Sequence, residues 1–134
     1  LNGKIPMVPD AAFPMVDVHD VAKLHVQALK NPKISGKRFI ASGKDPVSFA
    51  DVAQILLNQG HKGPSTKKAP SWLLKLLSSF DREAKGMLAL LGMKLSADNS
   101  NTIKIFKWTP IPFEKTVIQS ANSIKIIQTK LMNS

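Results

Sequence analysis

The chain has 134 residues, of which 43% are hydrophobic and 21% are charged, and it contains no cysteine. This length fits a single domain with one core, and the composition argues against wholesale disorder. The lack of cysteine excludes disulfides, thiol nucleophiles and cysteine-ligated zinc or iron–sulfur centres. No apolar run is long enough for a transmembrane helix. Because the chain opens on Leu1 without a leader-like segment and contains no cysteine, we expect residues 1–134 to be a single cytoplasmic portion of a larger protein.

The formal net charge is +10, from nineteen Lys and Arg residues against nine Asp and Glu residues. This charge raises the alternative of a basic, non-catalytic module that binds nucleic acid or an acidic partner. Only Arg38 and Arg82 are arginines, however, and arginine is the side chain best suited to read guanine edges. The lysines are also spread along the whole chain. We therefore favour a solvated lysine-rich surface, and expect neither a nucleic-acid nor a membrane partner.

The first part of the chain predicts a strand, a helix and a second strand. Residues 5–18 hold three prolines between short apolar runs, which indicates short or edge strands at about 5–8 and 13–16. Residues 37–42 are short, aromatic and β-branched and end at a glycine, so they also predict a strand. A helix of about ten residues between two strands is typical of a βαβ unit in a parallel sheet.

The helix between these strands has clear boundaries. Asp17 is a good N-cap, and Asp20 follows three residues later, where a carboxylate can reach free amides. Asn31-Pro32 ends the helix near Lys30. Helical spacing predicts an inward face of Val18, Val21, Ala22, His25, Ala28 and Leu29.

The rest of the chain predicts a mainly helical lobe. Ser48 caps a helix from Phe49 to about Gln59 that ends at Gly60, with Val52, Ile55 and Leu56 inward. A short strand near 65–69 is followed by helical segments from Pro70 to Gly92. A final helix pair covers about 97–106 and 113–131, separated by two prolines.

Few residues predict chemistry. The three histidines lack metal-ligand spacing, and no glycine-rich phosphate loop, serine-hydrolase elbow or tyrosine is present. His25 is expected to be a satisfied core residue. His19 lies at a strand-to-helix junction, where parallel sheets bind ligands, although a solvent-facing first-turn residue is the commoner outcome. Asp17 and Asp20 are read as helix-start residues rather than an acid–base pair.

A set of bulky apolar residues could line a hydrophobic ligand pocket, form simple core, or pack on a missing part of the protein. The set is Met7, Phe13, Met15, Trp72, Leu76, Leu77 and Met87.

The order of several motifs resembles the second half of extended short-chain dehydrogenases/reductases, closest to the dihydroflavonol-reductase-like group of NAD-dependent epimerases/dehydratases. The segment from Val16 to Ala22 resembles that group's V-D-V-x-D-V-A, and Gly36 to Ile40 resembles its G-x-R-[FY]-I. The segment from Lys107 to Glu114 resembles its G-W-x-P-x-P-F-E-E. Further matches are Ser48-Phe49-x-Asp51-Val52-Ala53, Pro70-x-Trp72-Leu73-Leu74 and Asp98-Asn99-Ser100. Two departures are His19, where the family often has Arg, and Lys107, where a glycine usually ends the helix.

The resemblance implies a helix-rich C-terminal portion of a Rossmann-type reductase, with a mainly helical substrate lobe. In such enzymes the N-terminal domain, absent here, holds the dinucleotide loop and the catalytic Tyr and Lys. We therefore assign no catalytic, cofactor-binding or metal residue to this chain, and expect NAD or NADP only in the full-length parent. The expected role is substrate binding together with the missing domain, and the expected substrate-lining residues are Met7, Val8, Phe13, Met15, His19 and Trp72. A sheet edge left exposed by the missing domain would allow self-association.

Overall fold

The computed structural model describes residues 7–70, 72 and 91–132. Most of the segment predicted to be helical between Pro70 and Gly92 lies outside these ranges, as do residues 5 and 6 of the first predicted strand. The described elements are β1 (Ala12–Pro14), α1 (Val18–Leu29), the 3-10 helix η1 (Pro32–Ile34), β2 (Pro46–Ser48), α2 (Phe49–Asn58), α5 (Ser100–Phe106) and α6 (Phe113–Met132). The fold is therefore mixed α/β and rich in helix, as expected.

The sheet differs from the prediction. β1 and β2 pair antiparallel, with Phe13 opposite Val47. Parallel pairing is limited, within the described ranges, to two isolated bridges, Val8 with Lys68 and Ala12 with Lys94. The predicted βαβ unit is thus wrong for this part of the chain: residues 37–42 are not in a strand. A strand needs a neighbour, and here the β1 segment takes β2 as its partner instead.

Helix α1 has the predicted boundaries but only part of the predicted face. The Asp17 side chain caps it by accepting from the backbone N–H of His19, and Lys30 ends it. Its buried residues are Asp20 and Leu24, whereas Val18 is 73% exposed and Leu29 is 87% exposed. Of the expected face, Val21 and Ala28 are half-buried and the other four residues are exposed. The expected inward face is therefore only partly right, because the helix is anchored through Asp20 and Leu24.

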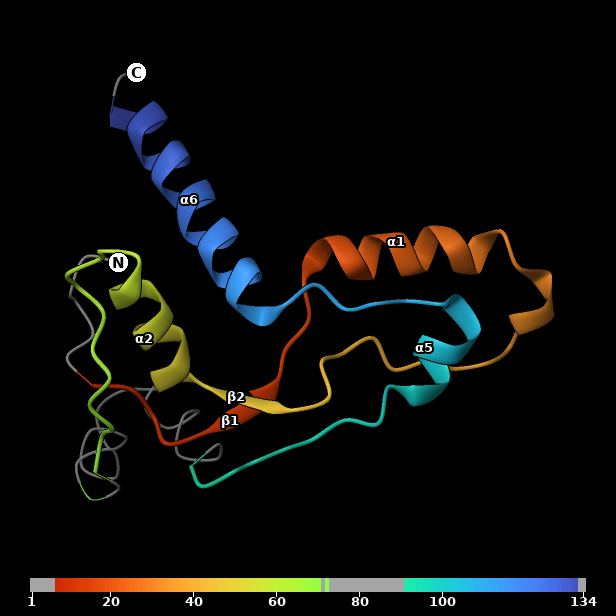
Figure 1. Cartoon of the computed structure of the whole chain (residues 1–134), viewed down its shortest axis with the longest axis horizontal. Helices are drawn as coiled ribbons and strands as arrows, with labels where there is room; N and C mark the ends of the chain where they lie inside the picture. Colours follow the sequence, from red (N-terminus) through yellow and green to blue (C-terminus); the bar gives the residue numbers. More distant parts are fainter. Residues whose placement is uncertain (1–6, 71, 73–90, 133–134) are drawn as a thin grey trace.

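Helices α2 and α6 pack together on one side of the molecule (Figure 1). Ser48 and Asp51 form a capping box at the start of α2, and Gly60, at φ +81°, follows its end. Ala53 of α2 and Val117 and Ala121 of α6 are buried. Beyond this contact α6 extends away from the other elements (Figure 1). Among the helices of the described residues, none is long and apolar enough to cross a membrane.

Helix α5 lies near α1 at the other end of the molecule (Figure 1). It begins at Ser100, three residues after the predicted start, and its Phe106 packs edge-to-face on Phe39 with ring centroids 5.0 Å apart. The helix ends at Lys107, which adopts the left-handed conformation (φ 49°, ψ 38°) that favours glycine. A lysine therefore ends this helix with the geometry a glycine would supply. Trp108, which follows, is buried.

Candidate functional site

A pocket of about 380 Å³ lies between α2 and α6. α2 contributes Val52 and Leu56, which are one helical turn apart and therefore share a face. The chain after β1 contributes its floor, and α6 contributes most of the other wall. The full lining is Met15, Val16, Val52, Leu56, Phe113, Thr116, Val117, Ser120, Ala121 and Ile124. An apolar wall with two hydroxyl groups suits a small, largely hydrophobic ligand that carries a polar group.

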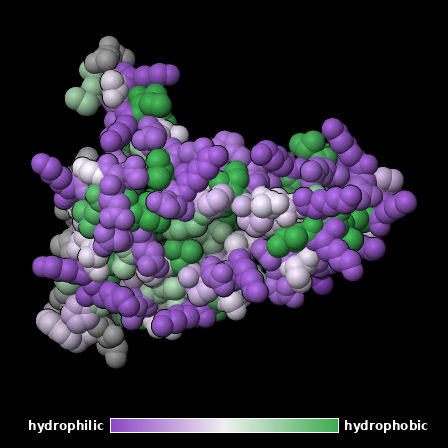
Figure 2. Space-filling view, viewed as in Figure 1, coloured by the Kyte–Doolittle hydropathy of each residue, from purple (hydrophilic) through white to green (hydrophobic). Residues whose placement is uncertain are grey.

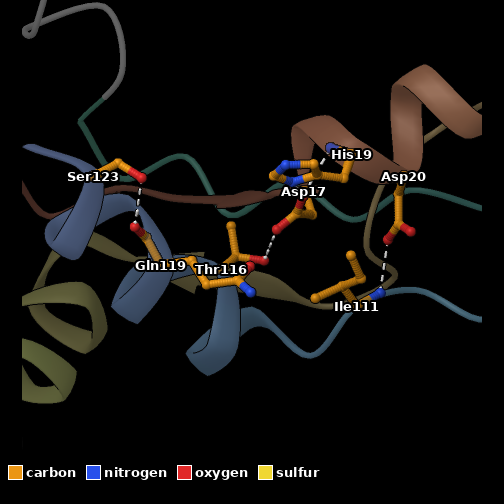
Figure 3. A network of polar contacts seen from close by, with 7 residues as sticks. All are labelled: Asp17, His19, Asp20, Ile111, Thr116, Gln119 and Ser123. Atoms are coloured by element: carbon orange, nitrogen blue, oxygen red, sulfur yellow. Dashed lines mark hydrogen bonds and ion pairs between the residues drawn. The ribbon is translucent and has the colours of Figure 1, made fainter.

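A network of hydrogen bonds fixes one end of this pocket (Figure 3). Asp17 is only 4% exposed. Its Oδ1 accepts from the backbone N–H of His19 and lies 2.8 Å from His19 Nδ1. Its Oδ2 accepts from the Thr116 hydroxyl at 2.8 Å. Thr116 also lines the pocket, so the cap of α1 and the pocket wall are held by the same side chain.

These hydrogen bonds set the charge state of the network. The hydrogen bond from Thr116, followed by those from the backbone and side chain of His19, holds the pKa of the Asp17 carboxyl below its ordinary value. The carboxylate is therefore ionised at neutral pH and acts only as an acceptor. Because its contacts come from a hydroxyl, a helix N-terminus and an imidazole, we interpret Asp17 as a structural anchor rather than a general acid.

Asp20 makes the second anchor. Its carboxylate is 2% exposed and accepts a 2.7 Å hydrogen bond from the backbone N–H of Ile111. The expectation that Asp20 reaches back to the free amides of its own helix is not met for the described contacts. Instead, it ties the first turn of α1 to the segment before α6 (Figure 3). That segment leads directly into Phe113 and Thr116, which line the pocket.

The six predicted substrate-lining residues are not gathered in one place. Met15 lines the pocket between α2 and α6. Met7, Val8 and Phe13 are half-buried outside that lining, with Val8 in a bridge to Lys68 and Phe13 in β1. The His19 side chain is 69% exposed, as a first-turn residue, and Trp72 is 67% exposed.

His25 is not the core residue that its position in the sequence predicts. It is exposed on α1, and its Nδ1 donates to the carbonyl of Val21 at 2.8 Å. The structure therefore satisfies one ring nitrogen within the helix and leaves the ring in solvent. The expected burial fails for the same reason as at the other exposed residues of the predicted face, since α1 turns Asp20 and Leu24 inward.

Sequence reasoning missed the contribution of α6 to the pocket. Phe113, Val117, Ala121 and Ile124 recur at helical spacing, and this pattern was sufficient to identify an apolar face. The pairing of Thr116 with Asp17, however, joins positions 99 residues apart. No local sequence pattern predicts a contact between residues so far apart in the chain.

Comparison with protein-family models and with curated proteins gives no match to this chain. The described residues also contain no group of three or more His, Asp or Glu side chains that could hold a metal ion. The pocket and the hydrogen bonds that frame it are therefore the features of the described residues that bear on function.

Proposed function

We propose that this chain is the substrate-binding part of an NAD(P)-dependent oxidoreductase of the extended short-chain dehydrogenase/reductase type. The parent would act as a carbonyl reductase or as a sugar-type epimerase/dehydratase. The observation that carries the proposal is the contact between the two most distinctive motifs of the resemblance. Asp20 of the V-D-V-x-D-V-A segment accepts from Ile111 of the W-x-P-x-P-F-E segment, and Asp17 accepts from Thr116 just beyond it.

These two hydrogen bonds explain in physical terms what the two motifs do in the fold. Asp17 caps α1 and also accepts from Thr116 of α6, and Asp20 in the first turn of α1 accepts from Ile111 just before α6, so a change in either motif should shift the pocket wall. The proposal assigns the pocket between α2 and α6 to the apolar body of the substrate. The exposed Ser120 hydroxyl, at the pocket lining, is free to meet a substrate hydroxyl or carbonyl group.

The residues of this pocket do not fit a dinucleotide. Its lining has no Lys or Arg and no glycine-rich turn that could bind a pyrophosphate. We therefore place no part of NAD or NADP in it and derive no hydride transfer from these side chains. In this proposal the chain binds and orients the substrate, and the rest of the parent enzyme supplies the cofactor and the catalytic groups.

The test is a pair of titrations on the whole 134-residue chain. Acetophenone, an apolar ketone, is titrated into ¹⁵N-labelled protein, and NADPH and NADH are titrated separately by calorimetry. We expect amide shifts at Met15, Val52 and Ala121 with the ketone, and no binding of either nucleotide at micromolar concentration. Ser120→Trp should fill the pocket entrance and abolish the shifts. Ser123→Trp, also exposed on α6 but outside the pocket lining, is the matched control.

Two results would reject the proposal in different ways. Micromolar binding of NADPH or NADH by the chain alone would refute the division of roles. Ketone shifts that are absent, or equal in Ser120→Trp and Ser123→Trp, would refute the assignment of this pocket to the substrate.

A further inference from the structure

The pocket between α2 and α6 is long and narrow. Its lining runs along α6 from Phe113 to Ile124, but along α2 only from Val52 to Leu56. The advance from Phe113 to Ile124 corresponds to about 16 Å of helix. A volume of about 380 Å³ spread over that length leaves a channel about 5 Å wide. At ordinary carbon–carbon contact distances, such a channel admits one carbon chain rather than a bulky branched group.

The lining of this channel offers few polar partners. Among the described residues that line it, only Thr116 and Ser120 have polar side chains. The Thr116 hydroxyl already donates its proton to Asp17, so its oxygen can only accept a further hydrogen bond. Ser120 lies one turn further along α6 and is exposed. Its hydroxyl is therefore the side-chain donor that the described lining leaves for a ligand.

This supply of partners limits the polar groups that a ligand can bring into the pocket. A sugar carries several hydroxyl groups, and each one that enters an apolar site without a partner costs free energy. A ketone or a secondary alcohol carries one oxygen, which Ser120 can satisfy. No Lys, Arg, Asp or Glu belongs to the described lining, so a charged ligand gains no ion pair there. Of the two parents considered above, the pocket therefore favours the carbonyl reductase over the sugar-type enzyme.

The apolar face of the pocket continues outward along α6. Ile124 ends the lining and is 46% exposed. Ile127, three residues further on and on the same side of the helix, is 57% exposed. On the face of the molecule seen in Figure 2, hydrophobic residues reach the surface in the region where α2 and α6 lie. A straight chain whose oxygen meets Ser120 can therefore lie along α6 towards Ile124.

We propose that the ligand of this pocket is an unbranched aliphatic ketone or the corresponding secondary alcohol. Ser120 binds its oxygen, and Ile124 contacts its longer arm. This inference rests on the proposed function, because it names the substrate class of the same pocket.

The test is a set of ketone titrations into the whole ¹⁵N-labelled chain. The straight series is methyl ethyl, methyl butyl and methyl hexyl ketone. Methyl tert-butyl ketone is the branched isomer of methyl butyl ketone, and methyl α-glucoside is the sugar probe. We expect amide shifts at Met15, Val52 and Ala121, with an affinity that rises about two- to fourfold per added methylene. The branched isomer should bind at least about fivefold more weakly than the straight one, and the glucoside should give no shifts.

Two pairs of variants locate the two ends of the ligand. Ile124→Ser should reduce the gain from methyl butyl to methyl hexyl ketone at least about twofold and leave methyl ethyl ketone unchanged. Ile126→Ser, at a residue that is 57% exposed and outside the lining, is its matched control. Ser120→Ala should weaken every straight ketone about three- to tenfold without changing the gain per methylene. Ser123→Ala, also exposed but outside the lining, should change neither.

The outcomes distinguish this inference from the proposed function. Ketones that shift the pocket amides without a gain per methylene, or with equal affinity for the two isomers, would overturn the unbranched ligand and leave the pocket assignment standing. A glucoside that binds as tightly as methyl butyl ketone would also overturn it, in favour of the sugar-type parent. Equal effects of Ile124→Ser and Ile126→Ser would overturn the placement along α6. An absence of shifts with every ketone, acetophenone included, would overturn the inference and the pocket assignment together.

Discussion

The hydroxyl of Thr116 donates a 2.8 Å hydrogen bond to the carboxylate of Asp17, across 99 positions of sequence. The same carboxylate caps α1 through the backbone N–H of His19. One charged group therefore serves a local role, in starting a helix, and a long-range role, in joining the first and last described helices.

Stability should fall in acid partly through Asp17. Hydrogen bonds from Thr116 and His19 lower its pKa in the folded chain, whereas the unfolded carboxyl titrates near about 3.9. The folded state therefore gains stability from ionised Asp17 above that pH and loses it as the pH falls through the lowered pKa. Asp17→Asn should lower the urea midpoint clearly at pH 7 and much less at pH 3. Asp45→Asn, at an exposed acid with no hydrogen bond in the described residues, should leave both midpoints almost unchanged.

Asp20→Ala should destabilise the chain by about 1–3 kcal/mol, because the backbone N–H of Ile111 loses its buried acceptor. Urea unfolding at pH 7 measures the loss. Asp20→Asn keeps an oxygen that can accept from Ile111, so it should retain part of the stability. An equal loss in the two variants would contradict the role given to this hydrogen bond and favour a role for the charge alone.

Lys107→Gly should stabilise the chain by about 0.5–1 kcal/mol. Lys107 holds a left-handed conformation at φ 49°, which costs an ordinary residue about 1–2 kcal/mol and glycine very little, although glycine loses more entropy on folding. Lys107→Ala removes the same side chain without relieving the backbone and is the control. If the alanine variant gained as much stability as the glycine variant, the backbone explanation would be wrong.

Thr102→Val should cost about 1 kcal/mol, because it conserves the volume of a side chain that is 1% exposed but removes the donor to the carbonyl of Ile40. Thr109→Val, at an exposed threonine, should change the stability little. Thermal unfolding of both variants checks the difference. The Thr102 variant should also speed hydrogen exchange at Gly43, the nearest amide of this segment that has a hydrogen-bond acceptor, which a general loss of packing would not confine to that segment.

The bounds of α1 and α2 could be predicted because their signals are local. Asp17 and Ser48 cap helices with their own side chains, and Asn31-Pro32 and Gly60 end them. The inward face of α1 could not be predicted in this way. Its apolar residues outnumber its buried ones, and the orientation follows from the contact of Asp20 with Ile111, which lies 91 residues away.

The strand predicted at residues 37–42 also depends on contacts that are distant in the sequence. The alternation of Phe39, Ile40 and Ala41 is present in the structure, but pairing depends on a neighbour, and the described chain provides side chains of α5 instead. For the pocket, Met15 was predicted, whereas Thr116 was not. Met15 is a bulky apolar residue, which by itself indicates a hydrophobic lining. The hydroxyl of Thr116 acquires its role only from the carboxylate of Asp17, which is distant in the sequence.

The contacts of Asp17 and Asp20 also set an order of events during synthesis. Their partners lie 99 and 91 residues further along the chain. At a translation rate of about 5–20 residues per second, about 5–20 s pass between the synthesis of Asp17 and that of Thr116. During that interval α1 can form its local cap but cannot be anchored. A ribosome-bound chain that stops before Ile111 should therefore leave α1 accessible to proteases, which the completed chain resists.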